Sequence, residues 1–385
     1  MRDVISQPRD GGERKRWLIA EGFQPVGLSD DLAKAKTIEL PSRHFVEATS
    51  KHIDMFLLPR DTKTLGSQQV NVRNRSNKNT IIYQAPHILV AKGFSKIAFA
   101  DFDVSFRHAI RGIKGPTQDR ELLAFLAAYL RSDLARYYLF HTSNWGVARQ
   151  EVHIDELLRL PFVLPADSDN PKRAQEIVSK VARILKDAAR AADRDMVDRD
   201  GIVREASGKA ESLIEKYFDI DTLEKKLIDD TLDIIIPSTR PTRARQAIPT
   251  LQPTTSDQLS AYLALVCEIL NSWSAKSSYV VRGQIEGSAD IGVGVALLEK
   301  VRKQRAAPAA ELITHDVLRV LNEIRTAFPQ RGATLDIVRG VMAFVGDKLY
   351  IAKPIGQRFW SNTAAINDAD EIAGTILMKA TKGDR

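Results

Sequence analysis

A short polar segment from Val70 to Lys78 carries the side chains best suited to recognition chemistry. It reads VNVRNRSNK and combines Arg73, Arg75 and Lys78 with three asparagines. Arginine and lysine contact phosphates or the edge of guanine, whereas asparagine pairs with the edge of adenine. The segment therefore predicts either a solvated hairpin loop or a loop that reads a groove of nucleic acid.

Further cations in the same part of the chain complete the candidate nucleic-acid-binding set. They are Lys92, Arg107, Arg111, Lys114 and Arg149. Each is either an ordinary surface cation or a phosphate or base contact. The formal net charge of +7 and the isoelectric point near 9.3 favour a polyanionic partner, because cations that approach phosphates release condensed counterions.

Motifs of several enzyme classes are missing from the sequence. A methyltransferase that acts on the amino group of a flipped base needs an Asn-Pro-Pro-Tyr or Asp-Pro-Pro-Tyr loop, and neither tetrapeptide occurs. The Gly-x-x-x-x-Gly-Lys phosphate loop and the Gly-x-Ser-x-Gly elbow are also absent. Glu224 and its lysine neighbours lie in a helical pattern, whereas a metal-dependent nuclease site requires such residues on a strand beside an aspartate. The histidines show no metal-ligand spacing, so we expect no catalytic residue, metal or cofactor in this chain.

The bulk composition sets the broad class of the protein. A chain of 385 residues with 44% hydrophobic content is longer than a typical single domain, so two folded units are expected. One cysteine, Cys267, excludes an intramolecular disulfide and a multi-cysteine zinc site. No apolar run approaches the roughly 18 residues that span a bilayer, and the first residues lack a secretory signal. We therefore expect a cytoplasmic protein without membrane contacts.

The hydrophobic pattern divides the chain into segments. Residues 1–35 are polar and predict a flexible lead-in, and short strand-like runs such as TIELP, MFLLPR, TIIYQ and HILVAKGF fill residues 36–113. After Pro116, leucines at intervals of three and four predict a helix with Asp119 as its cap. Together these patterns predict a β-rich domain that ends in helical segments, over residues 36–165.

Residues 141–165, HTSNWGVARQEVHIDELLRLPFVLP, form the most distinctive stretch of that domain. Trp145 precedes Gly146, which adopts turns that other residues resist, and Pro161 ends a short amphipathic segment. We interpret Trp145, Gly146 and Pro161 as an architectural motif, and call residues 141–165 the strut.

The remainder of the chain predicts two further parts. Residues 166–236 carry long helical patterns, residues 237–257 form a linker rich in proline and arginine, and residues 258–385 alternate helix and strand signals. The predicted fold class is α+β, with a β-rich recognition lobe, then long helices, then a separate small α+β C-terminal domain.

One family resemblance follows from two successive segments. HILVAKGFSKIAFADFDVSFRHAIRGIKG and ELLAFLAAYLRSDLARYYLFHTSNWGVARQEVHIDELLRLPFVLP resemble the C-terminal target-recognition region of bacterial N6-adenine DNA methyltransferases of restriction-modification or phage-defence systems. The resemblance covers roughly residues 36–236, and it implies that residues 36–165 form a target-recognition-like domain. The S-adenosylmethionine-binding domain of that family has no counterpart in this sequence.

The resemblance implies a specificity subunit or fragment that binds double-stranded DNA and directs a separate methyltransferase catalytic subunit, which would hold S-adenosylmethionine. In that interpretation the chain has no activity alone and serves as part of a site-specific adenine-N6 methyltransferase. Two alternatives stay open. In the first, the chain is a non-catalytic interaction protein or an inactive remnant of a split methyltransferase. In the second, it is an enzyme whose motif is not recognised.

Overall fold

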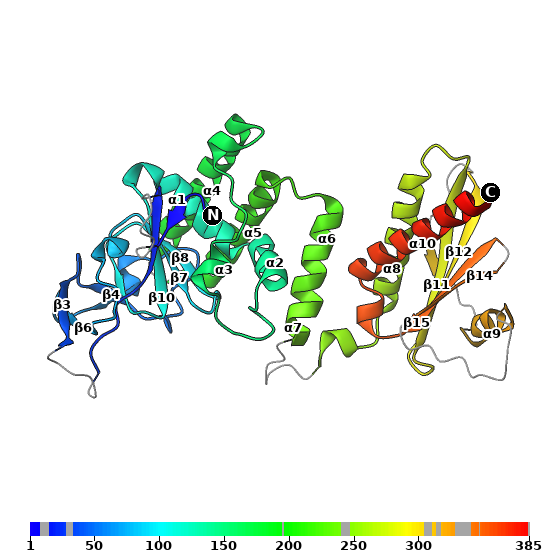
Figure 1. The fold of residues 1–385 in the computed structure, drawn as a ribbon, viewed down its shortest axis with the longest axis horizontal. Coiled ribbons are helices and arrows are strands. Elements are labelled where there is room, and N and C mark those ends of the chain that lie inside the picture. The colour runs from blue at the N-terminus through cyan, green and yellow to red at the C-terminus, as the bar shows by residue number, and fades with distance from the viewer. Residues whose placement is uncertain are drawn as a thin grey trace. The chain divides into compact units, whose positions relative to one another are not determined.

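The computed structural model describes residues 1–7, 15–27, 34–194, 196–239, 247–303, 310–312, 317–327, 340–345 and 347–383. The chain divides into two compact units, an N-terminal unit of residues 1–221 and a C-terminal unit of residues 222–385. The N-terminal unit joins strands to long helices, and the C-terminal unit has its own sheet and helices, so the α+β class is confirmed (Figure 1).

The N-terminal unit is built on a five-stranded sheet in the order β1-β2-β10-β7-β8. Its strands are β1 (Ile5–Ser6), β2 (Trp17–Glu21), β7 (His87–Ala91), β8 (Ile97–Ala100) and β10 (Ile110–Lys114). β1 is parallel to β2, and the other neighbours are antiparallel. Every residue of β7 is buried because both faces of the central strands are covered.

The first two strands differ from the flexible lead-in that we expected over residues 1–35. Trp17 and Ile19 are buried, and β2 pairs with β10 about ninety residues further along the chain. The run WLIAE is too short to show a period, and its partner is remote, so local sequence did not reveal the strand. Residues 8–14 and 28–33 lie outside the described residues.

Two smaller sheets lie beside the central one and carry the rest of the β-rich lobe. They pair β3 (Lys36–Glu39) with β6 (Gln69–Val72), and β4 (His44–Val46) with β5 (Lys63–Thr64) and β9 (Ser105–Phe106). Leu89 on one face of the central sheet, with Phe45, Val72, Tyr83 and Phe106, belongs to the core that joins these sheets.

Two 3-10 helices fall on segments that we expected to be strands. TIIYQ forms η3 (Thr80–Tyr83), whereas only the end of MFLLPR enters a 3-10 helix, η2 (Pro59–Asp61). Pro59 provides the fixed φ angle that suits the first turn of η2. The Asn79 side chain accepts a hydrogen bond from the backbone N–H of Ile81, which caps η3 and turns the chain away from an extended course.

The leucine stripe after Pro116 forms two helices, α1 (Arg120–Arg131) and α2 (Asp133–Thr142). The chain breaks at Ser132, whose Oγ accepts from the N–H of Ala135 and caps α2. Asp119 makes no such cap for α1. Its carboxylate instead accepts hydrogen bonds from Arg16 and from the indole of Trp17 at 2.8 Å, because β2 lies beside the start of the helix.

One short helix and two long helices complete the described part of the N-terminal unit. They are α3 (Ile154–Leu157), α4 (Pro171–Ala192) and α5 (Arg199–Tyr217), with the short turns η4 (Thr117–Asp119) and η5 (Pro165–Asp167). α1 packs against β7 and β8 on one side and against α4 on the other. In Figure 1 these helices lie on the opposite side of the unit from β3 and β6.

The C-terminal unit has a five-stranded sheet in the order β13-β11-β12-β15-β14. Its strands are β11 (Tyr279–Ser288), β12 (Val293–Arg302), β13 (Ala310–Leu312), β14 (Val341–Val345) and β15 (Lys348–Pro354). Its helices are α6 (Thr222–Asp230), η6 (Thr231–Ile235), α7 (Ile236–Thr239), η7 (Pro249–Leu251), α8 (Ser256–Trp273), α9 (Val317–Ala327), η8 (Gln357–Phe359) and α10 (Asn362–Gly383).

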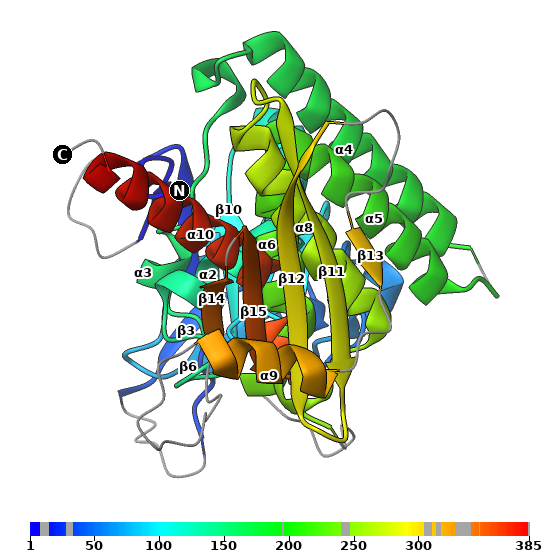
Figure 2. The ribbon, with the colours of Figure 1, turned by 90° about the vertical axis from the view of Figure 1, so that its right-hand side faces the viewer.

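Helices cover both faces of this second sheet. α8 and α10 lie on one face, where Leu263, Ile351 and Trp360 belong to the core, and α9 lies on the other, where Ile324 and Tyr350 do (Figure 2). Gly292 has a positive φ of 76° between β11 and β12. Gly292 therefore provides the turn of the β11–β12 hairpin, in a conformation that residues with a Cβ resist.

The boundary between the units lies earlier than the linker that we predicted at residues 237–257. Asp230 accepts hydrogen bonds from the side chain of Asn362 at 3.0 Å and from the N–H of Thr363 at 2.6 Å. These bonds cap α10, so α6 belongs with the C-terminal unit although its sequence continues the pattern of the preceding helices. Residues 240–246 of the predicted linker lie outside the described residues.

Candidate nucleic-acid interface

Residues 73–79, which we call the basic loop, follow β6 and are held by bonds to the segment after β2. The N–H of Gln24 donates to Ser76 Oγ at 2.9 Å, and the N–H of Arg73 donates to the carbonyl of Gln24 at 3.0 Å. The side chain of Asn77 donates to the carbonyl of Glu21 at 2.8 Å. The loop therefore has a defined backbone conformation, and Asn77 serves this architecture.

The same segment after β2 brings a second cation close to the basic loop. Pro25 pairs with Val72 on one side, whereas Phe23 pairs with Arg107 on the other. His108 also donates its N–H to the carbonyl of Phe23 at 3.0 Å. Because neighbouring extended chains lie roughly 5 Å apart, the basic loop and the turn at Arg107 are about 10 Å from each other.

The cations on the basic loop and at Arg107 differ in exposure and in the contacts that they make. Arg75 is exposed and makes no hydrogen bond or ion pair with a described residue. Lys78 is exposed and donates to the carbonyl of Asn74 at 2.7 Å, and Arg107 lies over the ring of Phe45 at 5.6 Å. Arg73 is half-buried at the start of the loop. We call these four cations the recognition surface.

Two other candidates form ion pairs within the unit. Lys92 Nζ lies 2.8 Å from Glu21 Oε1, and Arg149 lies 2.5 Å from Glu156 Oε1. A cation that is neutralised by a carboxylate attracts phosphate less strongly. The structure therefore gives Lys92 and Arg149 internal contacts that sequence alone did not predict.

Arg111 and Lys114 lie in β10 and point into the unit. Arg111 is only 4% exposed and donates to the carbonyl of Val152 at 2.5 Å, and burial lowers the pKa of its guanidinium. Lys114 donates to the carbonyl of Ala85 at 2.6 Å, and burial lowers its pKa also. Arg111 is buried and cannot reach a nucleic acid without local unfolding, whereas Lys114 is half-buried and its ammonium is held by the carbonyl of Ala85.

The strut closes over the turn between β7 and β8. The Trp145 side chain is buried, its ring packs edge-on against Phe94 at 5.9 Å, and its indole N–H donates to the carbonyl of Gly93. Gly146 has a φ of 95°, and a Cβ there would lie 2.7 Å from the ring of Phe140. Both residues therefore pack against other parts of the N-terminal unit.

Further bonds fix the strut along its length. The N–H of Val152 donates to the carbonyl of Lys92 at 2.9 Å, and the carbonyl of Val152 receives the bond from Arg111. At the exit, the carbonyl of Pro161 accepts from the hydroxyl of Tyr129 at 2.7 Å. The strut thus joins β7, β10 and α1, which explains its unusual sequence.

Sequence reasoning missed the segment that organises the basic loop. Gly22 is the available signal, because a Cβ there would lie 2.3 Å from the carbonyl oxygen of Phe106. A glycine followed by Phe23 and Pro25 is consistent with a close backbone approach in a β-rich region.

Neither metal chemistry nor a membrane span is visible in the described ranges. Within them, no group of three or more histidine, cysteine, aspartate or glutamate side chains is placed to hold a metal ion. The helices described here include none that is both long and apolar enough to cross a membrane.

Comparisons with known proteins give a weak structural likeness. No family model and no curated protein matches the chain. Among solved structures, the chain is similar to the HsdS subunit from Thermoanaerobacter tengcongensis, with a TM-score of 0.23 and 12% identity. The match covers 56% of this chain and 48% of that subunit, so it spans about half the length of each. A TM-score this low carries no functional argument.

Proposed function

We propose that the N-terminal unit is a target-recognition module for double-stranded DNA. The basic loop carries the proposal, because its backbone is fixed by bonds to residues 21–24 while the side chain of Arg75 extends outward. A rigid loop with an unpaired arginine can enter a groove at little entropic cost, and arginine recognises guanine through two hydrogen bonds.

The other cations of the recognition surface supply the affinity in this proposal. Lys78 and Arg107 flank the loop and contact phosphates, which position the module on the duplex without reading its sequence. The resemblance to the recognition region of N6-adenine methyltransferases supports a role in which the module directs a separate catalytic subunit. That subunit binds S-adenosylmethionine and carries the loop that holds the flipped adenine.

The test compares two substitutions in the presence of the catalytic partner. A preferred site is first selected from a random duplex library, and binding is then measured to this site and to a scrambled duplex across a salt series. Arg75→Ala is expected to lower the ratio of the two affinities. The binding free energies for the two duplexes should differ by about 1 to 3 kcal/mol less than in the wild type, which is the value of one bidentate base contact. Lys78→Ala is expected to weaken both complexes alike and to reduce the salt slope by about one unit.

Arg204→Ala is the matched control, because Arg204 is an exposed arginine on α5 that forms no hydrogen bond or ion pair with a described residue. It should change neither the affinity ratio nor the salt slope. If no substitution in the recognition surface changes the ratio, the recognition role fails and a non-catalytic interaction protein becomes the better interpretation.

A further inference from the structure

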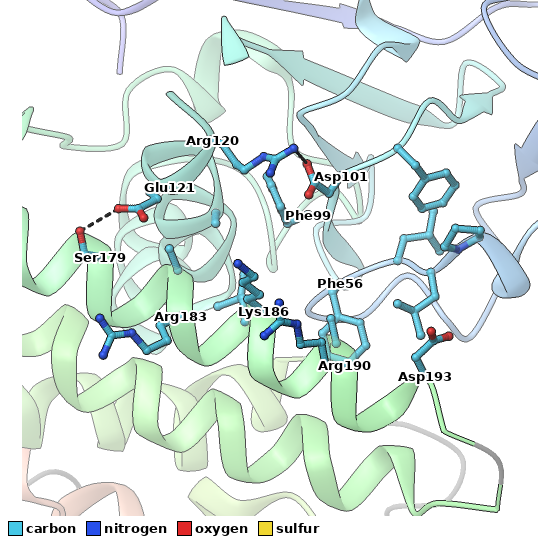
Figure 3. A pocket seen from close by; sticks show the side chains of 18 residues that line it. Phe56, Phe99, Asp101, Arg120, Glu121, Ser179, Arg183, Lys186, Arg190 and Asp193 are labelled. Atoms are coloured by element: carbon cyan, nitrogen blue, oxygen red, sulfur yellow. Dashed lines mark hydrogen bonds and ion pairs between the residues drawn. The ribbon is translucent and has the colours of Figure 1, made fainter. Parts of the chain in front are cut away.

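A pocket of about 500 Å³ lies in the N-terminal unit between α4, the start of α1 and residues 56–59 (Figure 3). Its volume is within the range of roughly 300 to 1,000 Å³ that small-molecule sites occupy. Phe56, Phe99 and Phe102 give one wall an aromatic character. The pocket therefore offers a place where a flat apolar group can leave water.

Three cations line the opposite wall. Arg183, Lys186 and Arg190 are spaced at intervals of three and four residues, so α4 presents them on one face. All three are exposed, and none forms a hydrogen bond or ion pair with a described residue. They extend over about 10 Å of the helix, at 1.5 Å per residue.

The acidic residues of the pocket offset part of this positive charge. Asp101 Oδ1 lies 2.9 Å from Arg120 and also interacts electrostatically with Lys186, and Asp193 lies 3.5 Å from Arg60. Glu121 accepts a hydrogen bond from the neutral Ser179 at 2.7 Å and keeps its charge. Four cations and three carboxylates line the pocket, so a net positive charge remains, and a concave site with apolar walls concentrates its field.

These two walls define the chemistry of the ligand. A fatty acid carries one charge for three cations, and inorganic phosphate has no group for the aromatic wall. A nucleoside phosphate satisfies both, because bases pack on aromatic side chains and guanidinium groups bind phosphate through paired hydrogen bonds. We propose that the pocket binds a nucleoside phosphate, either a free nucleotide or a nucleotide of a nucleic-acid strand. The proposal does not depend on the DNA-recognition role, because it requires no reading of duplex sequence.

Calorimetric titration of the full chain tests the pocket directly. ATP and GTP are compared with tripolyphosphate and with adenosine, which each present only one half of the ligand. At least one nucleotide is expected to bind about tenfold or more tightly than either half. Arg190→Ala should weaken that binding about tenfold, because it removes a charge-assisted contact, whereas Arg204→Ala on α5 should leave it unchanged.

A second variant separates a true pocket from a charged helix face. Ala189→Phe places a ring in the pocket and keeps every cation, so it should abolish nucleotide binding while circular dichroism confirms the fold. Tripolyphosphate binding as tight as nucleotide binding, together with indifference to Ala189→Phe, would overturn the proposal.

Competition with a single-stranded oligonucleotide distinguishes the two sources of the ligand. If the oligonucleotide displaces the nucleotide, and Arg190→Ala abolishes oligonucleotide binding, the ligand of the pocket is a nucleic-acid strand. If the oligonucleotide does not displace the nucleotide, the ligand is a free nucleotide. If neither nucleotides nor the oligonucleotide bind in a manner that depends on Arg190, the pocket has no such ligand. This outcome leaves the duplex-binding proposal intact, because that proposal is tested by Arg75.

Discussion

At the scale of single residues, His87 couples the stability of the N-terminal unit to pH. Its side chain is fully buried on β7, where Nδ1 lies 2.6 Å from the carbonyl of Ile82, and Nε2 has no hydrogen-bond partner within the described part of the chain. Desolvation lowers the pKa of His87 from 6.5 to about 4. The folded state therefore resists protonation, whereas the unfolded chain accepts a proton near pH 6.5.

The stabilising effect of neutral His87 is complete above pH 6.5 and is lost as the pH falls toward 4. Between pH 7 and pH 5 we expect the free energy of unfolding to decrease by about 2 kcal/mol from this residue. Urea denaturation followed by tryptophan fluorescence measures the change. His87→Gln should flatten the pH dependence, and His108→Gln, at an exposed position, should not. Equal slopes in wild type and His87→Gln would contradict the assignment.

The recognition residues show what a sequence can predict at this scale. The polar composition of residues 70–78 indicated a loop with cations, and the structure places Arg75 and Lys78 on such a loop. The separation of exposed from engaged cations was not predictable. Arg111 contacts Val152 and Lys92 contacts Glu21, and these partners lie 41 and 71 residues away in sequence.

At the scale of elements, the strut determines how the β-rich lobe is supported. Trp145→Ala removes a buried ring from its contact with Phe94, and we expect a loss of about 3 to 5 kcal/mol in the stability of the N-terminal unit. Because the residue supports the lobe rather than reads DNA, affinity for all duplexes should decrease together. Thermal melting and binding to selected and scrambled duplexes measure both effects. An unchanged melting temperature with a changed site preference would show that Trp145 contacts DNA.

Elements with strong local patterns were predicted, and those defined by remote contacts were not. The HILVA and KIAFA runs form β7 and β8, and the leucine stripe forms helices, because burial imposes its period on the sequence. TIIYQ has the composition of a strand, yet the cap from Asn79 makes it a 3-10 helix. The short run WLIAE gains its strand structure from pairing with β10.

At the scale of the whole molecule, the proposed division of labour predicts the activity of the isolated chain. No Asn-Pro-Pro-Tyr or Asp-Pro-Pro-Tyr loop is present to hold a flipped adenine, and extrusion of a base costs a few kcal/mol that such a pocket must offset. The purified chain should therefore transfer no labelled methyl group from S-adenosylmethionine to duplex DNA. Addition of the catalytic partner should produce transfer at one site. Transfer by the chain alone would overturn the specificity-subunit proposal.

The cap on α10 has a practical consequence for dividing the protein. A fragment that begins after the proline-rich segment would leave out Asp230 and remove the acceptor of the Thr363 N–H in the first turn of α10, and loss of such a cap typically costs about 1 kcal/mol. A fragment that begins at Thr222 keeps this carboxylate and the turns of α6 that carry it. Fragments of the C-terminal unit should therefore start at residue 222. The end of the proline-rich segment suggests residue 258 as the start, but that fragment lacks Asp230.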